Sequence, residues 1–200
     1  MSYEKYKINI PEGKAGDWEV KQFTVSEDNA RLGMLRSTYS FSSRGRCTPT
    51  GTYTSLTHRG TTIMSDTPDE IRDHFEMIRM AKGSVLINGL GLGVVLKAVL
   101  EKPEVTDATV IELSPEVIEL VGKHYQDKYG TRVQIINADA FTYKSPKGRR
   151  YGAVWHDIWD SICTSNIPEM HKLHRKYGSI ADWQGSWCRW QCERNRREGR

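Results

Sequence analysis

The chain has 200 residues, of which 38% are hydrophobic and 27% charged, and its formal net charge is +4. This composition describes a soluble globular chain with one main domain and smaller attachments at either end. No apolar run reaches the length of a membrane span, and the first residues, Met1 to Lys5, lack the apolar stretch of a secretory signal. We therefore expect a cytoplasmic protein with no membrane association.

The first two predicted regions precede the main domain. Residues 1–65 are rich in Thr, Ser, Gly and Tyr, and alternating stretches such as 18–25 predict small antiparallel strands. Residues 66–83 form a predicted connecting helix, because Asp66-Thr67-Pro68 supplies a capping side chain and an early Pro, and apolar residues then recur on one helical face. Gly83 is expected to end this helix.

The third region, residues 84–165, repeats a pattern of strand, turn and helix that predicts a parallel sheet covered by helices. One helix is predicted over 94–101 and a second begins at Ser114-Pro115, which caps it. The predicted strands are 84–88, 108–113, 132–137 and 151–158.

The fourth region, residues 166–200, is predicted to be helical, basic and Trp-rich, with a helix over 168–177 and no strand-like apolar run after Asp160. Its cysteines, Cys188 and Cys192, could share one helix face, but no second close ligand pair accompanies them, so we predict reduced thiols and no metal site. The basic tail is expected to be a solvated terminus, with RNA, DNA or an acidic partner as the alternative. Its arginines are Arg189, Arg194, Arg196, Arg197 and Arg200.

A glycine turn, Gly89-Leu90-Gly91-Leu92-Gly93, follows the first parallel strand and opens the next helix. Glycines at such a turn let a ligand approach the backbone amides at a helix N-terminus. An ordinary tight turn is the alternative. Val94 stands where the dinucleotide fingerprint needs a small residue, so the spacing argues against NAD or FAD.

Three further acidic elements follow the ends of successive predicted strands. Glu112, about 20 residues past the glycine turn, can accept hydrogen bonds from both hydroxyls of a ribose, or can cap the next helix. Asp139 can accept a hydrogen bond from an adenine amino group, or can form a turn. Asp157 and Asp160, three residues apart, can hold or deprotonate an amine, or can end a strand and cap a helix. All three elements converge on one crevice at the carboxyl edge of the sheet.

Together these residues resemble the spermidine synthase branch of the class I S-adenosylmethionine-dependent methyltransferase fold. The resemblance implies an α/β Rossmann-like parallel sheet with helices on both faces, preceded by a small antiparallel region, and S-adenosylmethionine as the cofactor. Such folds usually continue through three more strands, so we expect a sheet that is truncated at its C-terminal end. The resemblance covers about residues 50 to 160 and is carried by 60–77, 85–93, 110–117, 138–141 and 157–160.

The resemblance also implies roles for single residues. Glu112 would bind ribose, and Asp139 and Ala140 would bind adenine. Asp157 would be the general base, while Asp160 and His74 would face the acceptor, with Asp160 counted among the catalytic residues. The full cofactor-binding set is Gly89, Leu90, Gly91, Gly93, Glu112, Leu113, Asp139 and Ala140.

Three positions depart from the family pattern. Leu92 replaces an Asp that grips the aminopropyl amine, Thr62 or Ile63 replaces a Gln in the upstream hairpin, and Ser161 replaces a Pro after the second Asp. An Asp at position 92 would repel the carboxylate of intact S-adenosylmethionine, so its loss predicts that the intact cofactor is admitted.

The sequence therefore favours an S-adenosylmethionine-dependent methyltransferase acting on a small or amine-bearing acceptor. An aminopropyltransferase that uses decarboxylated S-adenosylmethionine is the first alternative, and a non-catalytic nucleotide-binding protein is the second. Among partners, we expect a small-molecule acceptor and a homo-oligomer. Only the basic tail supports a nucleic acid.

Overall fold

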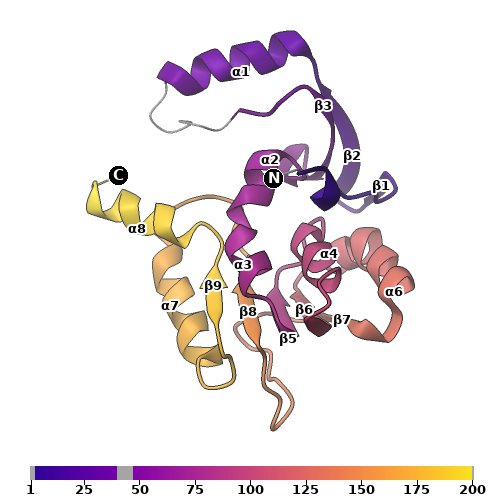
Figure 1. Ribbon diagram of the computed structural model, residues 1–200, viewed down its shortest axis with the longest axis vertical. Coiled ribbons are helices and arrows are strands. Elements are labelled where there is room, and N and C mark those ends of the chain that lie inside the picture. Colours follow the sequence, from indigo (N-terminus) through magenta and orange to yellow (C-terminus); the bar gives the residue numbers. More distant parts are fainter. Residues whose placement is uncertain (1–2, 40–46, 200) are drawn as a thin grey trace.

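The computed structural model describes residues 3–39 and 47–199, and Arg200 of the basic tail lies outside them. The chain builds two sheets, and Figure 1 shows the N-terminal antiparallel sheet above the parallel one. No helix in the described part of the chain is long and apolar enough to cross a bilayer.

The antiparallel sheet has the order β1-β2-β3-β4. Residues 18–25 form the predicted strand, which pairs along its whole length with β3. Arg59 and Gly60 both have positive φ and make the tight turn between β3 and β4, as a two-residue hairpin requires. The strands are β1 (Gly13–Ala15), β2 (Trp18–Val25), β3 (Gly51–His58) and β4 (Thr61–Ser65).

The second sheet is parallel throughout, with the order β7-β6-β5-β8-β9. From β5 the chain first adds β6 and β7 on one side and then β8 and β9 on the other. A crevice forms at the carboxyl ends of the strands where the two halves of the sheet meet. The sheet and the helices around it confirm the expected Rossmann-like fold. Its strands are β5 (Gly83–Asn88), β6 (Val105–Glu112), β7 (Val133–Asn137), β8 (Ala153–His156) and β9 (Gln184–Ser186).

Helices cover both faces of the parallel sheet because its strands are apolar on both sides. On β5, Val85 and Ile87 pack in the larger core with α4, while Leu86 packs on the other face against Leu173 and Tyr177 of α7. The helices are α2 (Pro68–Asp73), α3 (Phe75–Met80), α4 (Val94–Leu100), α5 (Pro115–Val117), α6 (Lys123–Tyr129), α7 (Asn166–Tyr177) and α8 (Arg189–Arg197). Single turns lie at η1 (Glu4–Tyr6), η2 (Ile118–Gly122) and η3 (Gly130–Arg132).

The flanking regions contain one helix that the sequence did not predict, and two predictions there are wrong. Residues 1–65 also contain a helix, α1 (Glu27–Tyr39), which has acidic residues in its first turn. The connecting helix over 66–83 is two short helices, α2 and α3, which meet at His74. Gly83 does not end a helix but begins β5 with a φ of +58°.

The region predicted to be helical, residues 166–200, also contains a strand, because β9 pairs with β8 as the fifth parallel strand. Its residues, Gln184, Gly185 and Ser186, carry no apolar side chain. The apolar surface comes from its neighbours instead. A Cβ atom on Gly185 would lie 2.6 Å from the ring of Trp183 and 2.8 Å from that of Trp155, so only glycine fits between these indoles.

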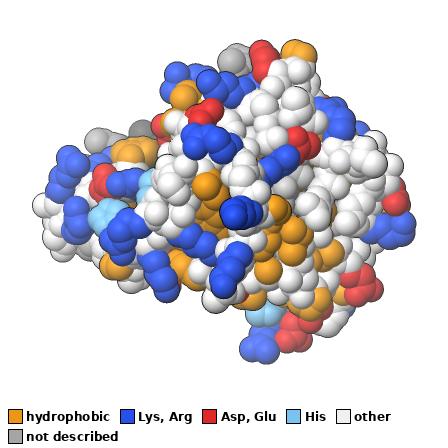
Figure 2. Space-filling view, turned by 90° about the horizontal axis from the view of Figure 1, so that it is seen from below, with side chains coloured by type: hydrophobic (Ala, Val, Ile, Leu, Met, Phe, Trp, Pro, Cys, Tyr) orange, Lys and Arg blue, Asp and Glu red, His pale blue; other side chains and the backbone are white. Residues whose placement is uncertain are grey.

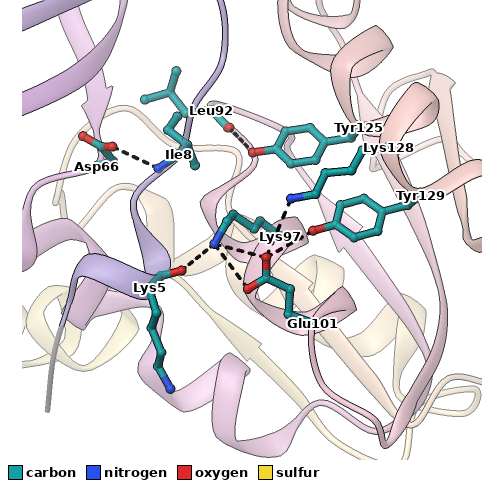
Figure 3. Close-up of polar contacts among 9 residues, drawn as sticks. All are labelled: Lys5, Ile8, Asp66, Leu92, Lys97, Glu101, Tyr125, Lys128 and Tyr129. Atoms are coloured by element: carbon teal, nitrogen blue, oxygen red, sulfur yellow. Dashed lines mark hydrogen bonds and ion pairs between the residues drawn. The ribbon is translucent and has the colours of Figure 1, made fainter.

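Polar contacts tie the N-terminal segment to the core, as Figure 3 shows. The backbone N–H of Ile8 donates to the buried carboxylate of Asp66, and the Lys97 ammonium donates to the carbonyl of Lys5. The hydroxyl of Tyr125, on α6, donates to the carbonyl of Leu92 at 2.9 Å. The N-terminal segment thereby connects Asp66, which follows β4, to α4 of the parallel-sheet region.

Candidate functional site

A cavity of about 940 Å³ opens at the carboxyl edge of the parallel sheet, between that sheet and the antiparallel sheet. Among the described residues that line it there is no Lys or Arg. The cavity is therefore an acidic site with apolar walls, which suits a cationic ligand. Its carboxylates belong to Glu70, Glu112, Asp139, Asp157 and Asp160.

The glycine turn closes one side of the cavity, through Gly89 and Gly91. Neighbouring protein atoms also leave no room for a side chain at two of its glycines. A Cβ atom would lie 1.9 Å from the carbonyl oxygen of Asp157 at Gly89, and 2.2 Å from the ring of Tyr125 at Gly93. Leu90 is buried in the core, and neither it nor Gly93 lines the cavity. The predicted role of these two residues in cofactor binding therefore depends on their backbone atoms.

Met64, on β4, packs against the middle of the glycine turn. Its Sδ atom accepts a hydrogen bond from the backbone N–H of Leu92 at 3.0 Å. A Cβ atom on Gly91 would lie only 2.1 Å from this sulfur. The space that the sequence assigns to a ligand beside Gly91 is therefore filled by a thioether, and no sequence signal points to this residue.

Glu112, at the end of β6, bridges the two loops that form the crevice. One carboxylate oxygen accepts the N–H of Leu90 at 2.7 Å and the other accepts the N–H of Ser114 at 2.8 Å. Each oxygen keeps a second lone pair for a ligand hydroxyl. Beside it, Leu113 lines the cavity with 70% of its surface exposed, an apolar platform for a flat ring.

Asp139 and Ala140 line the cavity past the end of β7. One Asp139 carboxylate oxygen accepts the N–H of Phe141 at 2.8 Å, so this side chain does form the turn that the alternative predicts. The carbonyl of Ala140 accepts hydrogen bonds from Lys176 and from Tyr177, at 2.9 and 3.0 Å. Helix α7 thereby fixes the loop that carries both residues.

Asp157 and His74 meet at the floor of the cavity. The Oδ2 atom of Asp157 lies 3.8 Å from Nδ1 of His74, whose side chain is 2% exposed. Burial, together with the charges of Glu70, Asp73 and Glu112, raises the pKa of Asp157 to about 8. Burial lowers the pKa of His74 to about 4, so this imidazole is neutral.

The buried Nδ1 atom of His74 has no hydrogen-bond partner among the described residues. A buried polar atom without a partner is uncommon, and this one lies in the cavity wall beside a carboxyl group. The pair can therefore receive a hydrogen-bonding ligand, with Asp157 taking or giving a proton.

Asp160 and Leu92 lie in different environments. Asp160 also lines the cavity, but its side chain is exposed to solvent, so the two aspartates have different environments. Leu92 has 0% exposure and packs in the core, so its side chain forms no part of the cavity wall.

Several residues of the cavity wall carried no predicted role. Trp18 and His58 come from the antiparallel sheet and stack with ring centroids 4.5 Å apart. Trp159 follows β8 and is held by a hydrogen bond to Glu169, and Trp187 follows β9. The tryptophans near strand ends were the one feature of the sequence that could have indicated these residues. That they line one cavity depends on the antiparallel sheet and on strand β9, which was not predicted.

No known family model matches the chain, and no curated protein matches it. Among solved structures, a spermidine synthase from Thermotoga maritima is 16% identical over 86% of this chain and 52% of its own, with a TM-score of 0.49. A putative RNA methyltransferase from Pyrococcus horikoshii is 13% identical over 66% and 61%, with a TM-score of 0.44.

An S-adenosylmethionine-dependent methyltransferase from Clostridium acetobutylicum is 14% identical over 58% of this chain and 44% of its own, with a TM-score of 0.39. The chain thus spans less than two thirds of each of these three proteins. All three TM-scores are below 0.5, so no property of these proteins is carried over, and the function of this chain has to be inferred from the residues of its acidic cavity.

Proposed function

We propose that the protein is an S-adenosylmethionine-dependent transferase, and specifically a methyltransferase that acts on a small amine-bearing acceptor. The observation that carries this proposal is the cavity at the carboxyl edge, which has four Asp and Glu side chains besides Asp157 and no Lys or Arg among its described lining residues. A sulfonium cofactor and a protonated amine are both cations, and this lining attracts both.

The residues present fit the cofactor. Glu112 offers carboxylate lone pairs to ribose hydroxyls, and Leu113 offers an exposed apolar surface to the adenine ring. Asp139, on the loop fixed by α7, lies within the same cavity. When bound, S-adenosylmethionine supplies a methyl group that its sulfonium makes electrophilic.

Asp157 is the proposed general base. An ammonium group has no free lone pair, so transfer to nitrogen requires that its proton be removed first. A carboxyl group with a pKa near 8 is a stronger base than an ordinary carboxylate, so it can accept this proton once it is ionised. Neutral His74 offers an imidazole nitrogen to orient the amine, and Trp159 and Trp187 limit the access of water.

The second candidate is an aminopropyltransferase, and the same charge distribution favours it. Intact S-adenosylmethionine carries a carboxylate, and no Lys or Arg among the described lining residues is present to pair with it. The decarboxylated form lacks that group and would meet no repulsion. If this candidate is right, putrescine and decarboxylated cofactor incubated with the protein should release methylthioadenosine.

Isothermal titration with each cofactor form separates the two. The methyltransferase proposal expects saturable binding of intact S-adenosylmethionine, followed by methyl transfer to one or more members of an amine panel. Tight binding of the decarboxylated form alone would contradict methyl transfer and leave the aminopropyltransferase. Failure of both forms to bind would contradict both proposals and leave the non-catalytic alternative.

A further inference from the structure

A continuous belt of cations lies along a flank of the molecule outside the cavity. Figure 2 shows the molecule from the end to which the loop between β7 and β8 extends, with Lys and Arg side chains across the left and centre of this face. We call these residues the basic belt. They are Lys144, Lys147, Arg149 and Arg150 of the loop, Lys172, Arg175 and Lys176 of α7, and Arg196 of α8.

The belt is continuous because its elements meet in two surface hollows. One hollow, of about 480 Å³, is lined by the four loop cations and by Lys176. The other, of about 330 Å³, is lined by His171, Arg175 and Arg196, where α7 meets α8. Helix α7 therefore contributes to both hollows, through Lys176 beside the loop and Arg175 beside α8.

The positive charge of the belt is largely uncompensated. Residues 143–150 and 170–176 contain seven Lys and Arg and no Asp or Glu. Arg149 and Arg150 are anchored by ion pairs with Asp107 and Asp182. The remaining Lys and Arg of these two segments form no ion pair with a carboxylate in residues 3–39 or 47–199. They are Lys144, Lys147, Lys172, Arg175 and Lys176.

Aromatic rings lie among these cations. Tyr143 lines the larger hollow, and the Lys172 ammonium lies 4.8 Å from the ring centroid of Phe141, which also lines the acidic cavity. Cations that follow a phosphate backbone, together with rings on which bases can stack, are typical of sites for single-stranded nucleic acid. A lipid surface would require an exposed apolar face, but α7 buries Met170, Leu173 and Tyr177 and exposes Lys172 and Arg175.

We propose that the basic belt binds single-stranded nucleic acid through its phosphate backbone. From the sequence, only the basic tail was a candidate for contact with a nucleic acid. The basic belt is a different site, because most of its cations lie on the loop and on α7. It does not depend on the proposed function, since binding requires neither the cofactor nor the residues of the acidic cavity.

Fluorescence anisotropy with a labelled 20-nucleotide single strand tests the proposal on the full chain. The belt variant carries Lys144→Glu, Lys147→Glu and Lys172→Glu, three exposed positions. The matched control carries Lys14→Glu, Lys21→Glu and Lys123→Glu, which are exposed positions on the antiparallel sheet and on α6 and give the same net charge. Circular dichroism melting establishes that both variants are folded.

The belt variant should bind at least about tenfold more weakly than the wild type, and the control should stay within about threefold. The dependence of log K on log salt should become shallower by roughly 2 in the belt variant, since about 0.7 counterion is released for each contact with a single strand. Equal losses in both variants would overturn the proposal, because net charge alone would then explain binding. Absence of wild-type binding at low salt, or belt-dependent binding only to phosphatidylserine vesicles or polyglutamate, would also overturn it.

Discussion

The acidic cavity and the basic belt are neighbouring regions of the same α/β domain with opposite charge. The cavity collects five carboxylates at the carboxyl ends of the strands, with no Lys or Arg among its described lining residues. The belt collects Lys and Arg along α7 and the loop that precedes β8. The net charge of +4 indicates neither region, because it sums over the whole chain. The class of ligand that each region can bind depends on where the fold places the charges.

The two regions meet at the loop that follows β7. Ala140 lines the cavity, and its carbonyl accepts a hydrogen bond from Lys176 of the belt. Phe141 lines the cavity and lies beneath Lys172. A ligand that follows the belt would therefore reach the cavity rim, while the carboxylates inside repel phosphate. Variants on the cavity side should accordingly alter catalysis and cofactor binding and leave nucleic-acid binding unchanged.

The largest expected effect is that of Asp157→Asn on turnover. Removal of a general base costs roughly 100- to 10,000-fold in rate, while binding of the cofactor should stay within about threefold of wild type because Glu112 is untouched. Asp160→Asn is the matched control, since Asp160 is exposed, and its loss should be roughly tenfold or less. Full activity of Asp157→Asn in a methyl-transfer assay would exclude Asp157 as the base.

Glu112→Gln should weaken cofactor binding next most strongly. The substitution removes a charged acceptor that also holds the Leu90 and Ser114 amides, so we expect roughly a 10- to 100-fold rise in Kd, corresponding to about 1.5–3 kcal/mol. Titration calorimetry measures it. Glu119→Gln, an exposed change on η2, is the control and should leave Kd unchanged. An equal Kd for Glu112→Gln would remove Glu112 from the binding site.

The raised pKa of Asp157 predicts a pH dependence of stability. The folded state holds this proton more tightly than the unfolded chain does, so ionisation between about pH 4 and pH 8 lowers the free energy of unfolding. Asp157→Asn carries no ionisable group there and should gain at least about 1 kcal/mol relative to wild type between pH 5 and pH 9. Urea unfolding at both pH values measures this gain, and a constant difference would contradict the raised pKa.

Activity should follow the same ionisation. If Asp157 is the base, kcat should rise with pH through about pH 8, where the carboxyl group is half ionised, and should level off only above that pH, as ionisation becomes complete. His74, with a pKa of about 4, stays neutral throughout this range and adds no second limb. A rate that falls between pH 6 and pH 8 would be inconsistent with this assignment.

The smallest expected effect is that of Met64. Met64→Ala would free the Leu92 amide and the space beside Gly91, so cofactor affinity should rise about threefold, or roughly 0.7 kcal/mol. Met64→Leu retains most of the bulk without the thioether and should bind close to wild type. Weaker binding by Met64→Ala would instead identify the side chain as part of the cofactor-binding wall.

The parallel core could be predicted closely from the sequence because its signals are local. Continuous apolar strands, the glycine turn and the Ser114-Pro115 cap each report a structure within a few residues. The observed strands β5 to β8 overlap the predicted ranges, as does α7. Strand β9 could not be predicted, because its apolar packing comes from Trp155 and Trp183 and not from its own residues.

The residues of the candidate site also fall into those that local sequence signals predict and those that they do not. Residues that follow strand ends, such as Glu112, Asp139 and Asp157, were predicted from their place in the repeating pattern, and the cavity brings them together. Met64 and Trp18 reach the cavity only because the antiparallel sheet folds over it, which is a tertiary relationship that local patterns do not carry. The burial of Leu92 likewise depends on how the turn packs against Tyr125.

Titration of the wild-type protein with intact S-adenosylmethionine tests the central claim most directly, because every proposed role in the cavity presupposes that this ligand binds there. The account predicts a saturable isotherm with one site per chain that Glu112→Gln weakens and the belt variant leaves unchanged. Absence of binding, or binding that is equally strong in Glu112→Gln, would contradict it.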